Sequence, residues 1–320
     1  MTLATSEVRP TPGVRAATPP KSPRSRRRSR RLRRYAQWLF AVPALFTILW
    51  FFGFPIVKNV VMGFQDYTTT TFYTGVAPWV GFANYARVLG SDVFSTAATN
   101  TALFTVASVA FQFVLGLLLA LYFRRAFPLN GVLRALLLLP WLIPIIASSA
   151  VWKLILDQDS GILNSALALL HIPAVPWLVS PDLALTAVIG VNIWFGIPFN
   201  VVILYSGLAA VPSELYEAAS LDGAVGWRAF WNITWPSIRS VVSVVVALGI
   251  ISTLKSVDVI LALTKGGPAN STQTLSTAAY DESFTQFQFG QGAAISNILI
   301  LVCLVFAVLY LLVSRKEVDE

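Results

Sequence analysis

Residues that could do chemistry are few in this chain of 320 residues, and the best placed are a lysine and an aspartate. Lys255 and Asp258 lie three positions apart inside a long apolar block. A charge in such a block is costly, so it usually faces a polar cavity or a partner charge. Residues three apart on a helix share a face. The two are therefore candidates either for a pair that positions helices or for a polar wall along a solute pathway.

Other reactive residue types are nearly absent. The chain has one cysteine, Cys303, and one histidine, His171, which excludes an intrachain disulfide and a multi-histidine metal site. No Gly-x-x-x-x-Gly-Lys-[Ser/Thr] segment occurs, so ATP hydrolysis by that route is excluded as well. An intramembrane enzyme would need a nucleophile with a base, or clustered carboxylates and histidines. We expect no catalytic residue, no metal site and no cofactor bound by this chain.

Uncharged polar and aromatic residues inside the apolar blocks are further candidates for contact with a solute. Amide groups can hydrogen-bond a polar solute, and an indole can stack on a sugar ring. Two of the asparagines are eight residues apart, so they fall near one helix face. Each polar residue could equally form a hydrogen bond between helices. The candidates are Gln112, Asn192, Trp194, Asn200, Tyr205 and Asn297.

Six apolar blocks must position these residues. The chain is 56% hydrophobic and 12% charged, whereas soluble domains carry about 25% charged residues. Each block is long enough for a membrane helix, which needs about 20 apolar residues. Prolines at 140, 144 and 198 should kink the helices that contain them. The sequence predicts an all-α membrane protein with a domain over 35–316 and spans at about 35–57, 97–123, 133–155, 183–209, 241–263 and 292–313, with an extension of the first to 62 left open.

The distribution of lysine and arginine predicts the orientation. Eleven of these residues lie in 1–34, three in 124–134, two in 210–240 and two at 315 and 316, against five in all other connections. Both termini are therefore expected in the cytosol of a bacterial cell, with the domain in the inner membrane. Segment 1–34 is expected to be a disordered basic tail that is held on the cytosolic side by this rule. Its run 24–34 could bind anionic lipid or nucleic acid, but nothing else in the sequence indicates a nucleic-acid partner.

The loop over 210–240, on the same side as the tail, has a distinctive pattern. Ser213 can cap a helix that carries two acidic residues in its first turns, and Gly223 can end that helix with a positive φ. A second short helix fits 227–231, and Pro236 marks the entry to the fifth span. We expect two short helices joined by a sharp turn.

Apolar side chains on this loop are expected to be partly exposed. Exposed apolar clusters indicate a partner, here Leu215, Ala219, Trp227, Phe230 and Trp231. A helix lying on lipid is the alternative, but it usually carries several basic residues. Because this helix is acidic, a protein groove with basic residues is favoured.

Three short runs in this loop resemble a known family. Glu-Ala-Ala at 217–219, Asp-Gly-Ala at 222–224 and Ile-Thr-Trp-Pro at 233–236 are similar to the EAA loop of binding-protein-dependent ABC importer permeases. Position 235 is Trp where most members have Leu. The resemblance implies the type I importer permease fold, insertion of the loop into an ATPase cleft, pairing of its central glutamate with a basic ATPase residue, and a glycine bend. The implied docking residues are Glu214, Glu217, Ala218, Ala219, Asp222, Gly223, Trp227, Phe230 and Pro236.

Other runs over 36–313 resemble the sugar-importer branch, of the maltose, trehalose and glycerol-phosphate permease type. They include Val-Gly-Phe-Ala-Asn-Tyr at 80–85, Val-Asp-Val-Ile at 257–260 and Gly-Gly-Pro at 266–268. The resemblance implies transport of a di- or oligosaccharide or a glycerol-phosphate-type solute. It also implies a second homologous permease, two ATPase subunits that hold ATP and Mg, and an extracytoplasmic solute-binding protein. A permease for an amino acid or phosphate, and more distantly a channel or noncatalytic assembly subunit, remain alternatives.

Overall fold

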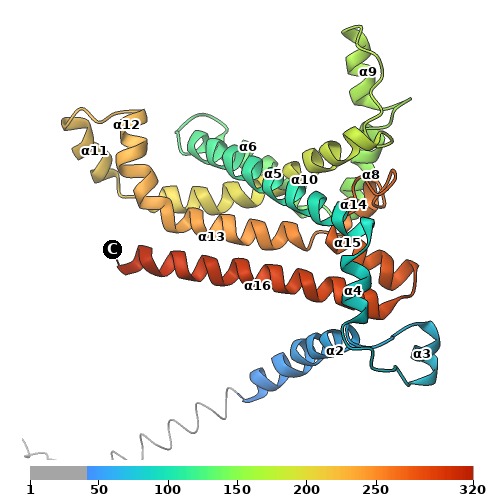
Figure 1. Cartoon of the computed structure of the whole chain (residues 1–320). Coiled ribbons are helices and arrows are strands. Elements are labelled where there is room, and N and C mark those ends of the chain that lie inside the picture. The colour runs from blue at the N-terminus through green and yellow to red at the C-terminus, as the bar shows by residue number, and fades with distance from the viewer. Residues whose placement is uncertain (1–41, 320) are drawn as a thin grey trace, which may run out of the picture. The chain divides into compact units, whose positions relative to one another are not determined.

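The computed structural model describes residues 42–319, and side chains as far as residue 312 (Figure 1). The predicted tail over 1–34 and the start of the first predicted span therefore lie outside the described residues. The chain divides into two compact units, Met1–Val57 and Lys58–Glu320. Each unit is considered by itself.

Helices make up almost all regular structure between residues 42 and 319. A single isolated bridge between Gln65 and Trp79 is the only β pairing in that range. Five helices there are long and apolar enough to cross a membrane, and a bent pair would be the sixth. The all-α membrane fold predicted from the sequence is confirmed.

The first apolar helix runs from Val42 to Met62 and includes the π-helical turn η1 (Leu49–Gly53) and α2 (Phe54–Met62). It ends at the longer of the two predicted limits. Phe46, Trp50 and Phe54 stack on one another at four-residue spacing, with ring centroids 5.9 Å apart in both pairs. These rings form one face of the helix because residues four apart lie one above the other.

The long helices α5 (Asp92–Phe123) and α10 (Pro181–Ala209) pack against each other. Ser91 caps α5 by accepting a hydrogen bond from the backbone N–H of Phe94, and Pro181 fits the first turn of α10 because it needs no hydrogen-bond donor there. A Cβ atom on Gly116 of α5 would lie 2.5 Å from the Cβ of Asn200, so this glycine permits the close approach. Pro198 lies inside α10 without ending it.

The third predicted span is broken. It consists of α6 (Asn130–Leu137), α7 (Leu139–Leu142) and α8 (Ile145–Ile155), with a bend of 99° between the first two and the third. At the break Ile143 has extended backbone, and Pro144 has φ −53° and ψ 131°. A proline restricts the preceding residue to extended backbone, so the predicted kink becomes a corner.

The observed helix differs at both ends from the fifth predicted span, 241–263. A continuous helix runs from Trp227 to Leu254, and its regular part is α13 (Trp235–Leu254). The separate short helix α14 (Asp258–Leu263) follows after a break. The carbonyl of Ser256 accepts a hydrogen bond from the Ser276 hydroxyl at 2.8 Å, so a tertiary contact replaces the bond that a continuing helix would form. The last helix, α16 (Phe289–Asp319), is unbroken.

Short helices and loops complete the structure at the end of α13 that lies far from α11 and α12 (Figure 1). They are α3 (Thr69–Thr74), α4 (Ala83–Leu89), α9 (Ile162–Leu169), α15 (Leu275–Tyr280) and η3 (Asp281–Thr285). Buried amides hold these loops. The Asn100 side-chain amide of α5 donates to the carbonyls of Asn270, Ser271 and Gln273 at 3.3, 3.0 and 2.9 Å. The segment between α14 and α15 is therefore fixed to α5.

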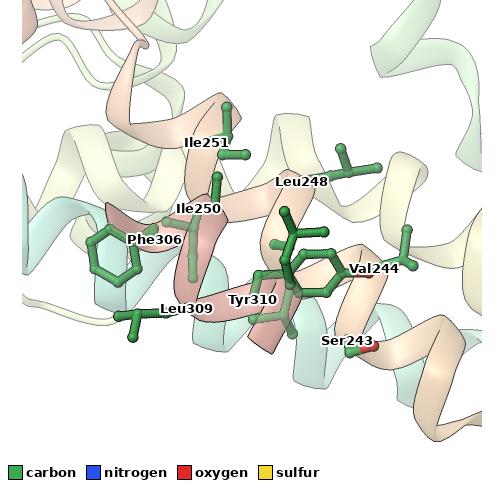
Figure 2. A pocket seen from close by; sticks show the side chains of 12 residues that line it. Ser243, Val244, Leu248, Ile250, Ile251, Phe306, Leu309 and Tyr310 are labelled. Atoms are coloured by element: carbon green, nitrogen blue, oxygen red, sulfur yellow. The ribbon is translucent and has the colours of Figure 1, made fainter. Parts of the chain in front are cut away.

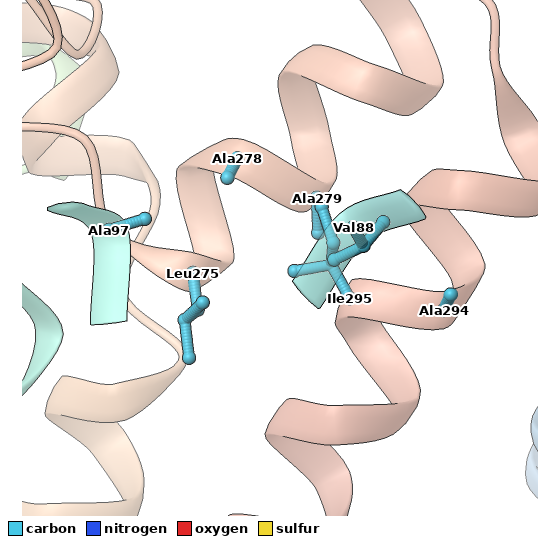
Figure 3. Packing of buried hydrophobic residues seen from close by; sticks show 7 residues of the cluster. All are labelled: Val88, Ala97, Leu275, Ala278, Ala279, Ala294 and Ile295. Atoms are coloured by element: carbon cyan, nitrogen blue, oxygen red, sulfur yellow. The ribbon is translucent and has the colours of Figure 1, made fainter. Parts of the chain in front are cut away.

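Small residues let α15, α16 and α4 pack closely (Figure 3). Ala278 and Ala279 of α15 lie in one buried cluster with Ala294 and Ile295 of α16 and Val88 of α4. A second buried cluster, on α5, α10, α13 and the 210–240 loop, includes Leu204, Leu208 and Ile238, all fully buried. It joins the loop to the membrane helices.

Candidate functional site

The 210–240 loop contains one short helix and the beginning of a long one. α11 spans Ser213–Leu221, and after five residues α12 (Trp227–Ala229) continues through η2 (Phe230–Thr234) into α13. The predicted second short helix is therefore the first part of the 28-residue helix Trp227–Leu254. Pro236 lies inside that helix, as the second residue of α13.

Two glycines build the turn between the helices. Gly223 has φ 71°, its N–H donates to Ser220 at 3.2 Å, and the N–H of Ala224 donates to Ala219 at 2.8 Å. This pair of bonds is the Schellman arrangement that ends many helices. Gly226 has φ 58° and ψ −118°, and a bond from the Arg228 N–H to the Val225 carbonyl closes a type II′ turn around it. The bend predicted at Gly223 is confirmed, and Gly226 provides a second bend that the sequence reading missed.

The start of α11 differs from the prediction. Pro212, with φ −58° and ψ 139°, occupies the N-cap position, and Ser213 is the first helical residue and makes no side-chain cap. Proline suits this boundary because its fixed φ is compatible with entry into a helix. Glu214 still lies in the first turn, where the positive end of the helix dipole favours a carboxylate.

The outward surface of the loop combines acidic and apolar side chains. Leu215 is 47% exposed, Trp227 72% and Trp231 48%, while Ala219 and Phe230 are half-buried. The predicted exposure of these five residues is confirmed. The docking candidates Glu214, Glu217, Ala218, Asp222 and Gly223 are also exposed. Such a surface is suited to an apolar partner groove with basic residues at its rim.

The inward side of α11 is anchored to the helix bundle. The Tyr216 hydroxyl lies 3.0 Å from the Thr234 hydroxyl, and the Arg124 guanidinium lies 4.2 Å from the centre of the Tyr216 ring. Phe230 and Trp235 pack against the buried cluster that includes Leu204 and Ile238. A displacement of α11 would therefore be transmitted to the first turns of the helix Trp227–Leu254.

A cavity of about 400 Å³ lies between the broken third span, α10 and α13, and we call it the polar cavity. It brings together amide and hydroxyl groups with three aromatic rings. Among its described lining residues none is charged. The residues used below are Gln112, Trp141, Asn192, Phe195, Phe199, Ser252, Thr253 and Ser256.

Two of the predicted pathway residues meet at this cavity. The Gln112 side-chain amide donates to the backbone carbonyl of Asn192 at 2.8 Å. The amide nitrogen of Asn192 is buried and has no hydrogen-bond partner among the described residues. A Cβ on Gly196 would overlap the Gln112 amide, so the glycine makes room for this contact. An unpaired buried donor beside a cavity can bind a polar solute or water.

Three other predicted candidates lie away from the cavity lining. The Asn200 amide donates to the carbonyl of Gly196 in its own helix at 2.9 Å. Trp194 makes an edge contact with Trp152, with ring centroids 5.5 Å apart. Arg134 lies 4.4 Å above the ring of Tyr205. The Trp194 and Tyr205 contacts join α10 to the broken third span, whereas the Asn200 bond stays within α10.

Asn297 also takes part in contacts between helices. Its carbonyl oxygen accepts from Asn59 at 2.9 Å, and its amide donates to the Tyr85 hydroxyl at 2.8 Å. Both neighbours belong to the same unit as Asn297. This network corresponds to the interhelical alternative considered for every polar candidate.

Lys255 and Asp258 do not form the predicted pair. Lys255 is the C-cap residue of α13, and Asp258 is the first residue of α14, so the two do not share one helix. Both are exposed, and no ion pair joins them in the described part of the chain. Asp258 is favourably placed at the start of α14, because the helix dipole stabilises a negative charge there.

The sequence reading missed several residues that line the polar cavity. Gly249, Ser252 and Thr253 of α13 recur at spacings of three and four, so they form a small, polar stripe on one face, and Ser256 follows in the break after the helix. That spacing was a usable signal. The aromatic residues Trp141, Phe195 and Phe199 had no such signal, because apolar rings are common on every face of a membrane helix.

A second hollow, of about 570 Å³, lies between α13 and α16 and has a different character (Figure 2). Aliphatic and aromatic side chains such as Val244, Leu248 and Phe306 line it, with Ser243 and Tyr310 as the polar exceptions. It offers almost no hydrogen-bonding groups. The polar cavity is therefore the better candidate for contact with a hydrophilic solute.

Comparisons with known proteins agree with this geometry. Residues 112–318 match the model of the family described as binding-protein-dependent transport system inner membrane component. The trehalose/maltose transport system permease protein MalF of Thermococcus litoralis is 34% identical over 282 residues, which cover 88% of this chain and 94% of the relative. The diacetylchitobiose uptake system permease protein DasB of Streptomyces coelicolor is 32% identical over 293 residues, 89% of this chain and 88% of the relative.

A solved structure shares the fold. A chain of a bacterial alginate ABC transporter, in complex with an alginate pentasaccharide-bound periplasmic protein, superimposes with a TM-score of 0.77 at 22% identity, covering 89% of this chain and 95% of that chain. The family match spans the polar cavity and the 210–240 loop. The chain belongs to the family of binding-protein-dependent transport system inner membrane components, the permeases of ABC importers.

Proposed function

We propose that this permease carries a neutral sugar, of disaccharide or oligosaccharide size, across the membrane. The observation that carries the proposal is the lining of the polar cavity, which joins uncharged hydrogen-bonding groups to aromatic rings. Sugars present hydroxyl groups at their edges and C–H groups on their faces. The hydroxyls suit Asn192 and Thr253, and the C–H faces suit Phe199 and Trp141. The names of the relatives, which transport trehalose/maltose and diacetylchitobiose, support the same solute class.

The absence of charge from the described lining supports a neutral solute over a charged one. A zwitterionic amino acid or a phosphate needs opposite charges in a low-dielectric site, because an unpaired charge there is costly. The nearest sequence candidates, Lys255 and Asp258, are not among the lining residues. This supports a neutral sugar over an amino acid, phosphate or glycerol-phosphate-type solute. A volume of about 400 Å³ lies near the lower end of ligand sites, so a second permease subunit would complete the site.

The 210–240 loop is proposed to dock on one of two ATPase subunits that hold ATP and Mg. Its exposed acidic and apolar surface supports this role. Closure of the ATPases would displace α11 and the start of the helix Trp227–Leu254 together, since Tyr216 contacts Thr234. The far end of that helix carries Ser252 and Thr253, which line the cavity. The proposed docking surface and the cavity lining therefore share one helix, which is about 42 Å long at 1.5 Å per residue.

The proposed assembly includes an extracytoplasmic binding protein and a second homologous permease, with this chain in the bacterial inner membrane. The excess of basic residues in 1–34 and 124–134 supports cytosolic termini and a cytosolic 210–240 loop. A channel or assembly subunit would have no use for a loop with this acidic surface and these two glycine turns.

Uptake by the assembled importer in proteoliposomes tests the solute class. We expect ATP-dependent uptake of a labelled neutral sugar and none of histidine or inorganic phosphate. Phe199→Ala should raise the KM for the sugar with little change in basal ATP hydrolysis, because it removes a stacking face from the cavity. Uptake of histidine or phosphate, with none of any sugar, would contradict the proposal.

Copurification of the ATPase tests the docking role separately. Glu217→Lys reverses an exposed charge without affecting the buried side of α11. It should weaken copurification and uptake together, while the variant remains monodisperse. Copurification and uptake equal to wild type would exclude pairing of Glu217 with a basic ATPase residue.

A further inference from the structure

A groove of about 770 Å³ lies between the end of α5 and the 210–240 loop, and we call it the basic groove. One wall is aliphatic and consists of Val114, Leu117, Leu118 and Leu121, which recur at spacings of three and four on α5. Arg124 and Arg125 directly follow the end of α5 and line the groove at that point.

The opposite wall belongs to the 210–240 loop. It includes Tyr216, Gly226, Trp227 and Phe230. Trp227 lines this wall with part of its indole, while 72% of the residue remains exposed. Tryptophan is enriched at the level of lipid headgroups, where one end of the ring is apolar and the other is wet. The groove thus changes from aliphatic inside the span to aromatic and basic at the end of the helix.

Local contacts hold the two arginines in place. The Asn130 amide donates to the carbonyls of Phe123 and Arg125 at 2.8 and 2.6 Å, which fixes the turn after α5. The Arg124 guanidinium lies 4.2 Å from the Tyr216 ring centre. A guanidinium above a ring can still donate hydrogen bonds through the N–H groups in its plane. No acidic residue is among the described groove lining, and no ion pair engages either arginine there.

We propose that the basic groove binds an anionic phospholipid, with the phosphate at Arg124 and Arg125 and an acyl chain along Val114, Leu118 and Leu121. Basic pockets between membrane helices are suited to acidic lipid headgroups. Val114 lies ten residues before Arg124, so the aliphatic wall extends about 15 Å into the span. A soluble ATPase subunit cannot reach that depth, whereas an acyl chain lies there naturally.

The bound lipid would also brace the 210–240 loop. The phosphate would contact Arg124, whose other side lies on Tyr216, and Tyr216 contacts Thr234. Occupancy of the groove would therefore hold the end of α5 to α11 and to the start of the helix Trp227–Leu254. The lipid site depends on the membrane fold but not on which solute is transported.

Native mass spectrometry of the assembled importer tests the site. The importer is reconstituted in phosphatidylcholine vesicles with one-fifth phosphatidylglycerol and then extracted in mild detergent. The wild type should retain phosphatidylglycerol in preference to phosphatidylcholine. Arg125→Gln should weaken retention about five-fold and the double change of Arg124 and Arg125 to Gln about thirty-fold, corresponding to about 1 kcal/mol per arginine.

Arg239→Gln is the matched control. It removes the same charge from an exposed residue of α13, near the same end of the bundle, that does not line the groove. It should retain phosphatidylglycerol as the wild type does. If the double variant does not fold, the single change Arg125→Gln tests the lipid site, because that exposed side chain makes no contact with an aromatic ring in the described structure.

Crosslinking identifies the occupant directly. Photoactivatable phosphatidylglycerol, carrying its reactive group in the acyl chain, should label the α5 segment that contains Leu118. Equal retention of the two lipids by the wild type, equal retention by wild type and double variant, or labelling of an ATPase polypeptide with none of the α5 segment would each overturn the proposal. Sugar uptake is not a readout in any of these measurements, so their outcome is separate from that of the proposed solute.

Discussion

The two glycines of the 210–240 loop allow a prediction in which the free-energy cost of a substitution depends on backbone conformation alone. A Cβ atom added at Gly223 or Gly226 would meet nothing within 4 Å, so neither substitution creates a clash. Gly223 has φ 71° at the end of α11, where alanine costs about 1 kcal/mol and asparagine is tolerated. Gly226, with φ 58° and ψ −118°, occupies a region used almost only by glycine. Alanine or asparagine there should cost about 2–3 kcal/mol.

The difference should be visible in ATPase docking. If a substitution destabilises the loop conformation that docks, the affinity of the permease for the ATPase falls about ten-fold for each 1.4 kcal/mol of destabilisation. We expect Gly226→Ala to weaken ATPase binding about 30–140-fold and Gly223→Ala about five-fold, with Gly223→Asn close to wild type. Binding of purified ATPase to the permease in nanodiscs measures each constant. Equal effects of Gly223→Ala and Gly226→Ala, or a defect in Gly223→Asn as large as in Gly223→Ala, would refute the reasoning.

Two further predictions concern packing in the bundle. Gly196→Ala should displace the Gln112 amide from the polar cavity and raise the KM for the solute, whereas Gly190→Ala in the same helix, where a Cβ meets nothing, should be neutral. A KM unchanged by Gly196→Ala would contradict the contact. Asn100→Ala should remove the side-chain donor from three carbonyls, of which that of Gln273 is buried. It should lower stability by about 2–4 kcal/mol and reduce the thermal inactivation temperature in detergent, whereas Thr99→Ala, at an exposed neighbour, should not. Equal inactivation temperatures for these two variants would show that Asn100 does not hold the loop.

The membrane fold could be predicted from the sequence because long apolar blocks have few alternatives. The limits of α10 follow from a proline at its start and the end of its apolar run. The end of α13 at Leu254 could not be found this way, because the apolar run continues to Leu263. The chain breaks there through the Ser276–Ser256 bond, a contact 20 residues away in sequence.

The candidate site shows the same division between local and tertiary signals. Gly223 was identified because a glycine after a helical segment has a local reason to be there. The roles of Asn200 and Asn297 depend on what each amide contacts, which no spacing reveals. The Lys255–Asp258 pair was inferred from a three-residue spacing that has meaning only on a continuous helix. Once the helix ends between the two residues, that inference no longer holds.

The unbroken helix from Trp227 to Leu254 has a consequence for rotational phase. With about 3.6 residues per turn, each residue inserted between the loop and the cavity would rotate Thr253 by about 100° relative to Phe230. One inserted alanine after Leu248 would turn the hydroxyl stripe away from the solute while leaving the docking surface intact. If the loop docks and the cavity binds solute as proposed, the two sites are fixed to each other in rotation as well as in distance, so this helix can be lengthened only in nearly whole turns.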